Sequence, residues 1–254
     1  MSINLTMSWG DGLVQADLSK GVDLSFPLTP GMNNPTAWYC GPVTMEPVKG
    51  EGFVGAVSQG GSVNFRTITF NPHGHGTHTE SYGHIAPEIF PVNQSLTQFF
   101  FPAVVVTILP EPYGEDLRLT TSAIAAALRS YNAGFKAIIL RTSHSSSGPL
   151  VKDYSYTNPP YLEAEAAAYL RDFGVEHLLI DLPSVDREVD GGALLAHRAF
   201  WNYPDAPREN ATITELIHVP AALADGAYLL LLMLPNMEND AAPSRPILYP
   251  IQSV

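Results

Sequence analysis

From about residue 100 onward the sequence alternates between short apolar runs and alanine-rich segments with helical character. The apolar runs cover residues 103–109, 135–140, 175–182 and 227–234, and the helical segments cover residues 122–132 and 161–173. Strands separated by helices need crossover connections, which place the helices against a sheet with at least some parallel pairing. The order therefore predicts an α/β fold.

Signals at the ends of these segments support the pattern. Thr120, Thr121 and Ser122 are candidate N-caps for the first helix, and Gly134 and Gly174 are placed to end the two helices. Residues 1–65 are rich in Gly, Pro, Ser and Asn and predict an irregular lobe or a set of loops with short possible strands, whereas residues 66–70 predict a strand. The polar segment 143–160 predicts a lid, an oligomer contact or a plain surface loop. No linker divides the chain, so we expect one domain over residues 1–254.

Charge and cysteine content restrict the partners. The 254 residues carry a formal net charge of −12, which disfavours nucleic acid and anionic membrane surfaces. A single cysteine excludes an intrachain disulfide, and the first residues lack the pattern of a signal peptide. The apolar stretch 227–235 is too short to span a bilayer as a helix. We expect a soluble cytoplasmic protein that acts on a small molecule.

Histidines are concentrated directly after the strand at residues 66–70. Four of the eight fall within twelve residues, beside Glu80: His73, His75, His78 and His84. Imidazole and carboxylate are natural ligands of zinc, manganese and iron. Glycines 74, 76 and 83 give the backbone the freedom to bring such side chains together. The alternative is a surface cluster that binds no metal, but the density favours a metal site.

The cluster resembles the signature of the cyclase family of metal-dependent hydrolases, His-x-Gly-Thr-His-x-Asp-x-Pro-x-His. Gly76-Thr77-His78 matches its centre, Glu80 stands in place of the aspartate, and His84 matches the last histidine. The first family histidine falls on Gly74, which His73 and His75 flank, and Tyr82 replaces the proline. Further similar motifs follow in order: residues 22–32, 180–186, His197, residues 212–216 and residues 239–248.

This family includes bacterial kynurenine formamidases and isatin hydrolases. The resemblance implies a swivelling β/α/β fold with a mixed central sheet, and a homodimer or homotetramer. It implies hydrolysis of an amide carbon–nitrogen bond, in an aryl formamide or a small cyclic amide, by water that a divalent metal (zinc or manganese) activates.

The resemblance also implies a role for each site residue. His73, His78 and Glu80 are expected to hold the first metal, with His75 as the alternative to His73. Glu80 is expected to bridge to a second metal held by His197 and Glu215. We expect His84 to act as general base or proton shuttle, and Glu215 to belong to the catalytic set as well as to the ligands.

Other polar and aromatic residues receive weaker interpretations. Asp181 and Asp186 are interpreted as structural partners of the site, and Asp240 and Arg245 as an ion pair that fixes the tail. An aromatic substrate would have three candidate stacking partners: Trp38, Tyr82 and Trp201. The remaining histidines are interpreted as ordinary residues: His144, His177 and His218.

Two other functions compete with hydrolysis. The spacing His73-x-His75-x4-Glu80 suits a cupin-like non-haem metal dioxygenase, although a cupin is an all-β jelly roll and the predicted helices argue against it. The chain could also be a non-catalytic small-molecule binder on the same fold. A retained proton shuttle at His84 and the carboxylate of Glu215 argue against a pure binder.

Overall fold

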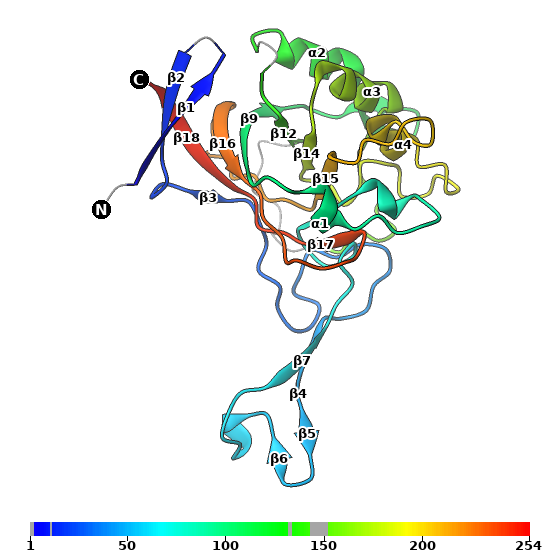
Figure 1. Ribbon diagram of the computed structural model, residues 1–254. Helices are drawn as coiled ribbons and strands as arrows, with labels where there is room; N and C mark the ends of the chain where they lie inside the picture. Colours follow the sequence, from blue (N-terminus) through cyan, green and yellow to red (C-terminus); the bar gives the residue numbers. More distant parts are fainter. Residues whose placement is uncertain (1–2, 11, 132–133, 143–151) are drawn as a thin grey trace.

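The computed structural model describes residues 3–10, 12–131, 134–142 and 152–254, and its centre is an eleven-stranded mixed sheet (Figure 1). In chain order its strands are β1 (Asn4–Trp9), β2 (Gly12–Asp17), β3 (Val22–Asp23), β8 (His78–Glu80), β9 (Phe100–Thr107), β12 (Ala137–Arg141), β14 (His177–Ile180), β15 (Thr212–Glu215), β16 (Gly226–Leu231), β17 (Ala241–Pro243) and β18 (Ile247–Ser253). Their spatial order is β1-β2-β18-β16-β9-β12-β14-β15-β8-β17, and β3 pairs with β18.

The middle of the sheet is parallel and carries the helices. Strands β9, β12, β14 and β15 are parallel neighbours, and antiparallel strands flank them on both sides. Helices α2 (Thr121–Leu128), α3 (Ala164–Phe173) and α4 (Leu195–Trp201) lie together over one face of these strands (Figure 1). The predicted α/β fold with a mixed sheet is confirmed.

Strand β12 shows why the apolar runs become central strands. All five of its residues are buried. Ile138 and Leu140 belong to the core on the helix side, whereas Ala137 and Ile139 belong to the core on the opposite face. Since successive side chains of a strand point to opposite faces, a strand covered on both sides must be apolar throughout.

Tertiary pairing moves several predicted boundaries. Helix α2 begins where expected, because the Thr120 side chain accepts a hydrogen bond from the Ala123 N–H, but it ends at Leu128, before Gly134. The helix predicted from residue 161 begins at Ala164, because residues 161–162 instead form β13 (Tyr161–Leu162), which pairs with the end of β11 (Asp116–Leu119). Gly174 ends α3 in a left-handed conformation, as predicted.

The N-terminal region is more regular than predicted. Strands β1 and β2 pair over six residues each, and β2 joins the main sheet through β18. Short strands were allowed for in residues 1–65, and the structure places two of them at residues 4–9 and 12–17, where they extend the main sheet. The remaining short elements are α1 (Val92–Ser95), β10 (Glu111–Tyr113) and the 3-10 helix η2 (Tyr82–His84). No helix among the described residues is long and apolar enough to cross a membrane.

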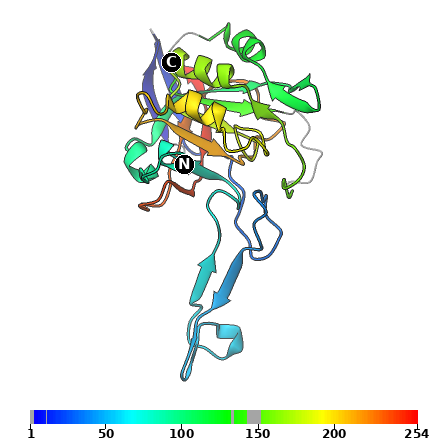
Figure 2. The same ribbon diagram turned by 90° about the vertical axis from the view of Figure 1, so that its right-hand side faces the viewer.

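Residues 44–69 form an arm that projects away from the sheet and helices (Figures 1 and 2). It consists of the paired strands β4 (Thr44–Pro47) and β7 (Arg66–Thr69), the paired strands β5 (Lys49–Gly50) and β6 (Phe53–Val54), and the 3-10 helix η1 (Val57–Gln59). The predicted strand at residues 66–70 exists, but it lies in the arm. In the main sheet it is β8 that carries residues of the histidine cluster, His78 and Glu80. Of the predicted loop at 143–160, residues 143–151 lie outside the described residues.

Buried His177 makes the stability of the fold depend on pH. Its ring lies in β14, and its Nδ1 is 2.9 Å from Thr212 Oγ1. Burial, together with Arg208 and Lys136, lowers the pKa of His177 from 6.5 to about 3. Because the unfolded chain then binds a proton more readily, the stability present above pH 6.5 is lost as the pH falls toward about 3.

We expect the free energy of unfolding to fall by about 2 kcal/mol between about pH 7.5 and pH 5 through this residue. The measurement is denaturant unfolding of wild type and His177→Gln at both pH values. The variant lacks the titrating ring, so its free energy of unfolding should fall by about 2 kcal/mol less than that of wild type over the same pH range. Equal pH dependence in the two proteins would refute the assignment.

Candidate metal centre and active site

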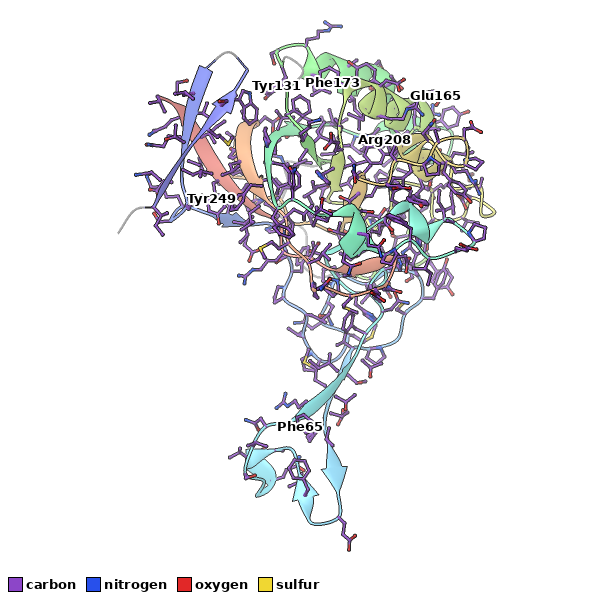
Figure 3. The ribbon with its side chains drawn as sticks, in the orientation of Figure 1. Phe65, Tyr131, Glu165, Phe173, Arg208 and Tyr249 are labelled. Carbon is purple, nitrogen blue, oxygen red and sulfur yellow. The ribbon has the colours of Figure 1, made fainter. Side chains whose placement is uncertain are left out.

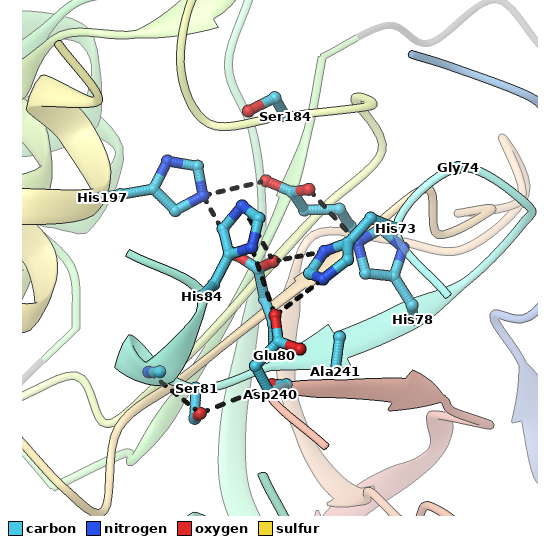
Figure 4. A network of polar contacts seen from close by, with 12 residues as sticks. His73, Gly74, His78, Glu80, Ser81, His84, Ser184, His197, Asp240 and Ala241 are labelled. Atoms are coloured by element: carbon cyan, nitrogen blue, oxygen red, sulfur yellow. Dashed lines mark hydrogen bonds and ion pairs between the residues drawn. The ribbon is translucent and has the colours of Figure 1, made fainter. Parts of the chain in front are cut away.

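Strand β8 carries two of the predicted ligands on one face. His78 and Glu80 are alternate residues of the strand, and both are fully buried. The strand is antiparallel to β15 and to β17, with Glu215 opposite His78 and Ala241 opposite Glu80. Residues more than 130 positions apart in the sequence therefore border one site (Figure 4).

The turn that precedes β8 brings in His73. The Asn71 side chain accepts a hydrogen bond from the His73 N–H at 2.9 Å. Gly74 is required by close approach, because a Cβ at this position would lie 2.3 Å from Cys40 Sγ. Gly76 has a φ of +74°, which glycine adopts without strain.

The two histidines in this turn have different environments. His73 Nδ1 lies 3.0 Å from Glu80 Oε2, and its Nε2 lies 2.8 Å from Asp240 Oδ2. His75 points elsewhere: its Nδ1 accepts from the Asn71 N–H, and its Nε2 lies 2.7 Å from the Gly41 carbonyl oxygen. Of the two candidates for the first ligand, the structure brings His73 into the cluster and leaves His75 outside it.

His84 enters from η2 and stacks on His73, with ring centroids 4.2 Å apart. The Ser81 side chain caps this short helix by accepting from the Gly83 N–H. His84 Nδ1 lies 3.3 Å from Asp240 Oδ2, and its Nε2 lies 3.9 Å from Glu80 Oε2. The ring is about one-third exposed, so it can reach both the cluster and a molecule outside it.

His197 and Glu215 complete the group from the opposite side. His197, in α4, places Nε2 3.0 Å from Glu80 Oε1 and Nδ1 2.6 Å from Asp186 Oδ2. Glu215 Oε2 lies 3.4 Å from His78 Nε2, and Glu215 Oε1 accepts from the Val185 N–H. The predicted role of Asp186 as a structural partner agrees with this contact.

The carboxylates strongly perturb the histidines. Burial lowers the pKa of His73, but the carboxylates of Asp240 and Glu80 outweigh it and raise that pKa to about 10. Burial opposes a charged His197 as well, yet Asp186 and Glu80 raise its pKa well above 6.5. Burial raises the pKa of Glu80, but His84 and His197 hold it well below its usual range. A cation that binds these nitrogens must therefore displace protons.

The donor set suits a divalent cation. Three groups of side chains bring one ligand atom each to within 4.8 Å of one another: His73, His78 and Glu80; Glu80, His84 and His197; and His73, His84 and Asp240. Within the described part of the chain, buried His78 Nε2 and Glu80 Oε2 find no hydrogen-bond partner. Glu80 Oε2 lies 3.0 Å from His73 Nδ1 and His78 Nε2 lies 3.4 Å from Glu215 Oε2, but neither pair forms a hydrogen bond. Two unpartnered buried ligand atoms side by side are what a metal site requires.

A cleft of about 360 Å³ opens beside the cluster, and His73, His84, His197 and Glu215 line it. Trp38 also lines the cleft. The other two aromatic candidates do not: Trp201 is fully buried and donates its Nε1–H to the Ala211 carbonyl, and Tyr82 stacks on Phe90.

The sequence matches the model of the Cyclase family over residues 22–187. This chain belongs to the cyclase family. Among its curated relatives, the kynurenine formamidase of Bacillus cytotoxicus is 29% identical over 196 residues, which cover 76% of this chain and 83% of the relative. The kynurenine formamidase of Bacillus anthracis is 27% identical over 238 residues, covering 92% and 99%.

Solved structures share the fold of this cyclase-family protein. One described as a potential metal-dependent hydrolase with cyclase activity superposes with a TM-score of 0.66 at 18% identity, covering 91% of this chain and 97% of the other. An isatin hydrolase bound to the product analogue thioisatinate superposes with a TM-score of 0.61 at 16% identity, covering 92% and 93%. The predicted cyclase-like fold is confirmed.

Sequence reasoning misplaced one residue of this cyclase-family site. Asp240 was expected to pair with Arg245, but Arg245 Nε instead donates to Asp23 Oδ2 at 2.7 Å, and Asp240 contacts His73 and His84. Asp240 lies in the motif at residues 239–248 that resembles the family, and this resemblance could have identified it as a site residue. Asp181 accepts from the Thr142 N–H, which does not belong to the cluster, so its predicted role as a structural partner of the site stays a prediction. His177 and His218 lie outside the cluster, and His144 lies outside the described residues.

Proposed function

We propose that this chain is a metal-dependent amidohydrolase that cleaves the carbon–nitrogen bond of an aryl formamide or a small cyclic amide. The observation that carries the proposal is the pair of unpartnered buried ligand atoms, His78 Nε2 and Glu80 Oε2, beside His73 at the end of a cleft. The relatives named kynurenine formamidase and isatin hydrolase support the choice of an amide substrate.

In this proposal His73, His78 and Glu80 hold the metal, which is zinc or manganese. The two oxygens of Glu80 face different histidines, Oε2 toward His73 and Oε1 toward His197. Glu80, His197 and Glu215 would hold a second ion, since His197 Nε2 lies within 3.8 Å of an oxygen of each carboxylate. When bound, a divalent cation lowers the pKa of a coordinated water molecule from about 15.7 to near 7 and polarises a carbonyl oxygen.

The protein's own groups supply proton transfer and orientation. His84 faces the cleft and is placed to take a proton from the attacking water and deliver it to the leaving nitrogen. Glu215 and Asp186 fix the buried side of the site through the Val185 N–H and His197. His78 and Glu80 are fully buried, whereas His73 and His84 line the cleft, so a substrate in the cleft can reach the cluster through these two histidines.

Trp38 supports an aromatic substrate. It lines the cleft with a φ of 60°, a left-handed conformation that is strained for tryptophan. Hydrogen bonds hold its neighbours in place: the Ala37 N–H donates to the Gly74 carbonyl, and the Tyr39 N–H to Ser155 Oγ. Strain maintained beside a cleft is typical of a functional residue, and an indole face can stack on a planar ring.

The other two functions have less support. The central parallel strands, the covering helices and the cyclase-family neighbours differ from the jelly roll that a cupin-like dioxygenase requires. A non-catalytic binder has the same fold, so catalysis must separate it from a hydrolase. A cytoplasmic location stays a prediction.

The decisive assay is hydrolysis by protein loaded with zinc or manganese, with aryl formamides and small cyclic amides as substrates. We expect turnover that is lost on chelation and restored by adding metal back. Trp38→Ala should raise KM for aromatic substrates more than for aliphatic formamides of similar reactivity. Hydrolysis that survives complete metal removal contradicts the proposal, and loaded protein that binds these amides without turnover favours the binder.

We also propose that the chain forms a homo-oligomer through the arm. Five apolar side chains of the arm are exposed: Phe53, Val57, Val63, Phe65 and Ile68. Figure 3 shows Phe65 on the arm, well away from the sheet. A two-stranded ribbon is marginally stable alone. The arm carries two acidic and two basic residues, so it can approach a second copy without the repulsion expected of a chain with net charge −12.

Sedimentation at micromolar concentration tests this assembly. We expect wild type to sediment as a dimer or tetramer, and Phe65→Asp combined with Ile68→Asp to sediment as a monomer, because each substitution places a charge in the covered apolar face. Ile89→Asp is the matched control, since Ile89 is equally exposed but lies outside the arm. A monomeric wild type, or an oligomer unaffected by the double substitution, contradicts the proposal.

A further inference from the structure

We propose that Asp240 is a positioning residue whose single oxygen Oδ2 sets the ring orientation of both His73 and His84. The inference rests on the proposed metal site, and it does not depend on which amide is the substrate. Both contacts are drawn in Figure 4, where Asp240 lies below the stacked rings.

The fold delivers Asp240 to this position through a very short edge strand. Asp240 immediately precedes β17, which pairs with β8 so that Ala241 lies opposite Glu80. The Ser81 N–H donates to the Asp240 carbonyl at 2.9 Å, and the Val92 N–H donates to the Asn239 carbonyl at 2.8 Å. Backbone hydrogen bonds therefore fix the main chain at this residue, and from there its carboxylate reaches His73 and His84.

At His73 the contact selects one tautomer. Nε2 lies 2.8 Å from Asp240 Oδ2, and Nδ1 faces Glu80 Oε2 at 3.0 Å. A neutral imidazole has one N–H, and the Asp240 carboxylate can only accept. With the proton on Nε2, the lone pair of Nδ1 points toward Glu80, where the cation is expected. Carboxylates that orient metal-bound histidines in this way raise metal affinity.

At His84 the same oxygen selects the opposite tautomer. Nδ1 lies 3.3 Å from Asp240 Oδ2, so the proton on Nδ1 points to Asp240, and Nε2 is left free on the side of Glu80. The ring planes of His73 and His84 differ by only 29°, which lets one oxygen reach both. Asp186 orients His197 in the same way: Nδ1 of His197 faces the Asp186 carboxylate, and Nε2 faces Glu80.

The test measures the affinity of Zn²⁺ and Mn²⁺ themselves, by competition with a chelator, in wild type and three variants. Asp240→Ala should bind metal 10- to 100-fold more weakly. Asp240→Asn should stay within a few-fold of wild type, because the amide oxygen still accepts a hydrogen bond. Asp23→Ala is the matched control, since it removes the ion pair of the same tail with Arg245 and leaves the cluster untouched. It should bind metal like wild type.

Nitrogen NMR of the histidine rings in Zn²⁺-loaded wild type gives an independent readout. We expect the proton of His73 on Nε2 and that of His84 on Nδ1. The opposite assignment overturns the inference even if Asp240→Ala does not fold. Unchanged metal affinity in Asp240→Ala also overturns it. An equal, larger loss in Asp240→Asn and Asp240→Ala makes Asp240 a metal ligand. If the affinities follow our expectation while no amide is hydrolysed, the proposed function fails and the inference stands.

Discussion

Replacing Glu80 with glutamine is expected to lower kcat/KM for amide hydrolysis by about a thousandfold or more. The carboxylate belongs to two of the three possible ligand groups, and its side chain is fully buried. An amide presents one oxygen in place of two and no charge, so metal binding should be severely weakened. Loss of the several kcal/mol that a cation contributes corresponds to at least three orders of magnitude in rate.

The measurement for Glu80→Gln combines steady-state kinetics with metal content after dialysis. Glu163→Gln is the matched control, because Glu163 forms its ion pair with Arg118 and belongs to none of the candidate ligand groups. The control should keep both metal and activity. A Glu80→Gln protein that retains stoichiometric metal and near-normal kcat/KM would falsify the ligand assignment.

Replacing His84 with alanine is expected to lower kcat by a factor of about 10² to 10⁴ while metal remains bound, because general acid–base catalysis contributes on this scale. The ring is partly exposed at the cleft, and its nearest approach to Glu80 is 3.9 Å, longer than its contact with Asp240. The relevant measurements are kcat and metal content in the same preparation, with His218→Ala as the control histidine. His218 packs against Phe26 at a tilted angle, outside the cluster.

The outcome of His84→Ala separates three roles. Metal retention with reduced kcat, and partial rescue by added imidazole, supports the proton shuttle. Loss of metal contradicts this role and makes His84 a ligand, which its membership in a ligand group with Glu80 and His197 allows. Unchanged kcat leaves the shuttle without support and favours a direct role for another cleft residue.

Strands β9, β12 and β14 could be predicted because burial on both faces forces a continuous apolar run such as residues 137–140, whereas the central strand β15 is Thr-Ile-Thr-Glu and has no such run. Strand β8 could not be predicted, since His78-Thr79-Glu80 is polar and becomes a strand only between β15 and β17. Residues 161–162 likewise became a strand through pairing with β11 rather than the first turn of a helix.

At the site, residue types and the family resemblance identified the histidines and Glu80 because they are adjacent in sequence. His197 and Glu215 came only from the resemblance, and the structure brings both to the cluster. Asp240 was assigned to the wrong partner because its distance from His73 is set by the β8–β17 register, which joins residues about 160 positions apart. Opposite charge and closeness in the sequence favoured an ion pair of Asp240 with Arg245.

Anomalous X-ray diffraction from crystals soaked in Zn²⁺ or Mn²⁺ tests the central claim most directly. We expect a peak about 2.0–2.2 Å from His73 Nδ1, His78 Nε2 and a Glu80 oxygen, the distance range of imidazole and carboxylate ligands. A second peak beside His197 and Glu215 would add the bridged ion. An unoccupied space between His73, His78 and Glu80 in metal-soaked crystals, or a peak held by other residues alone, would contradict the account.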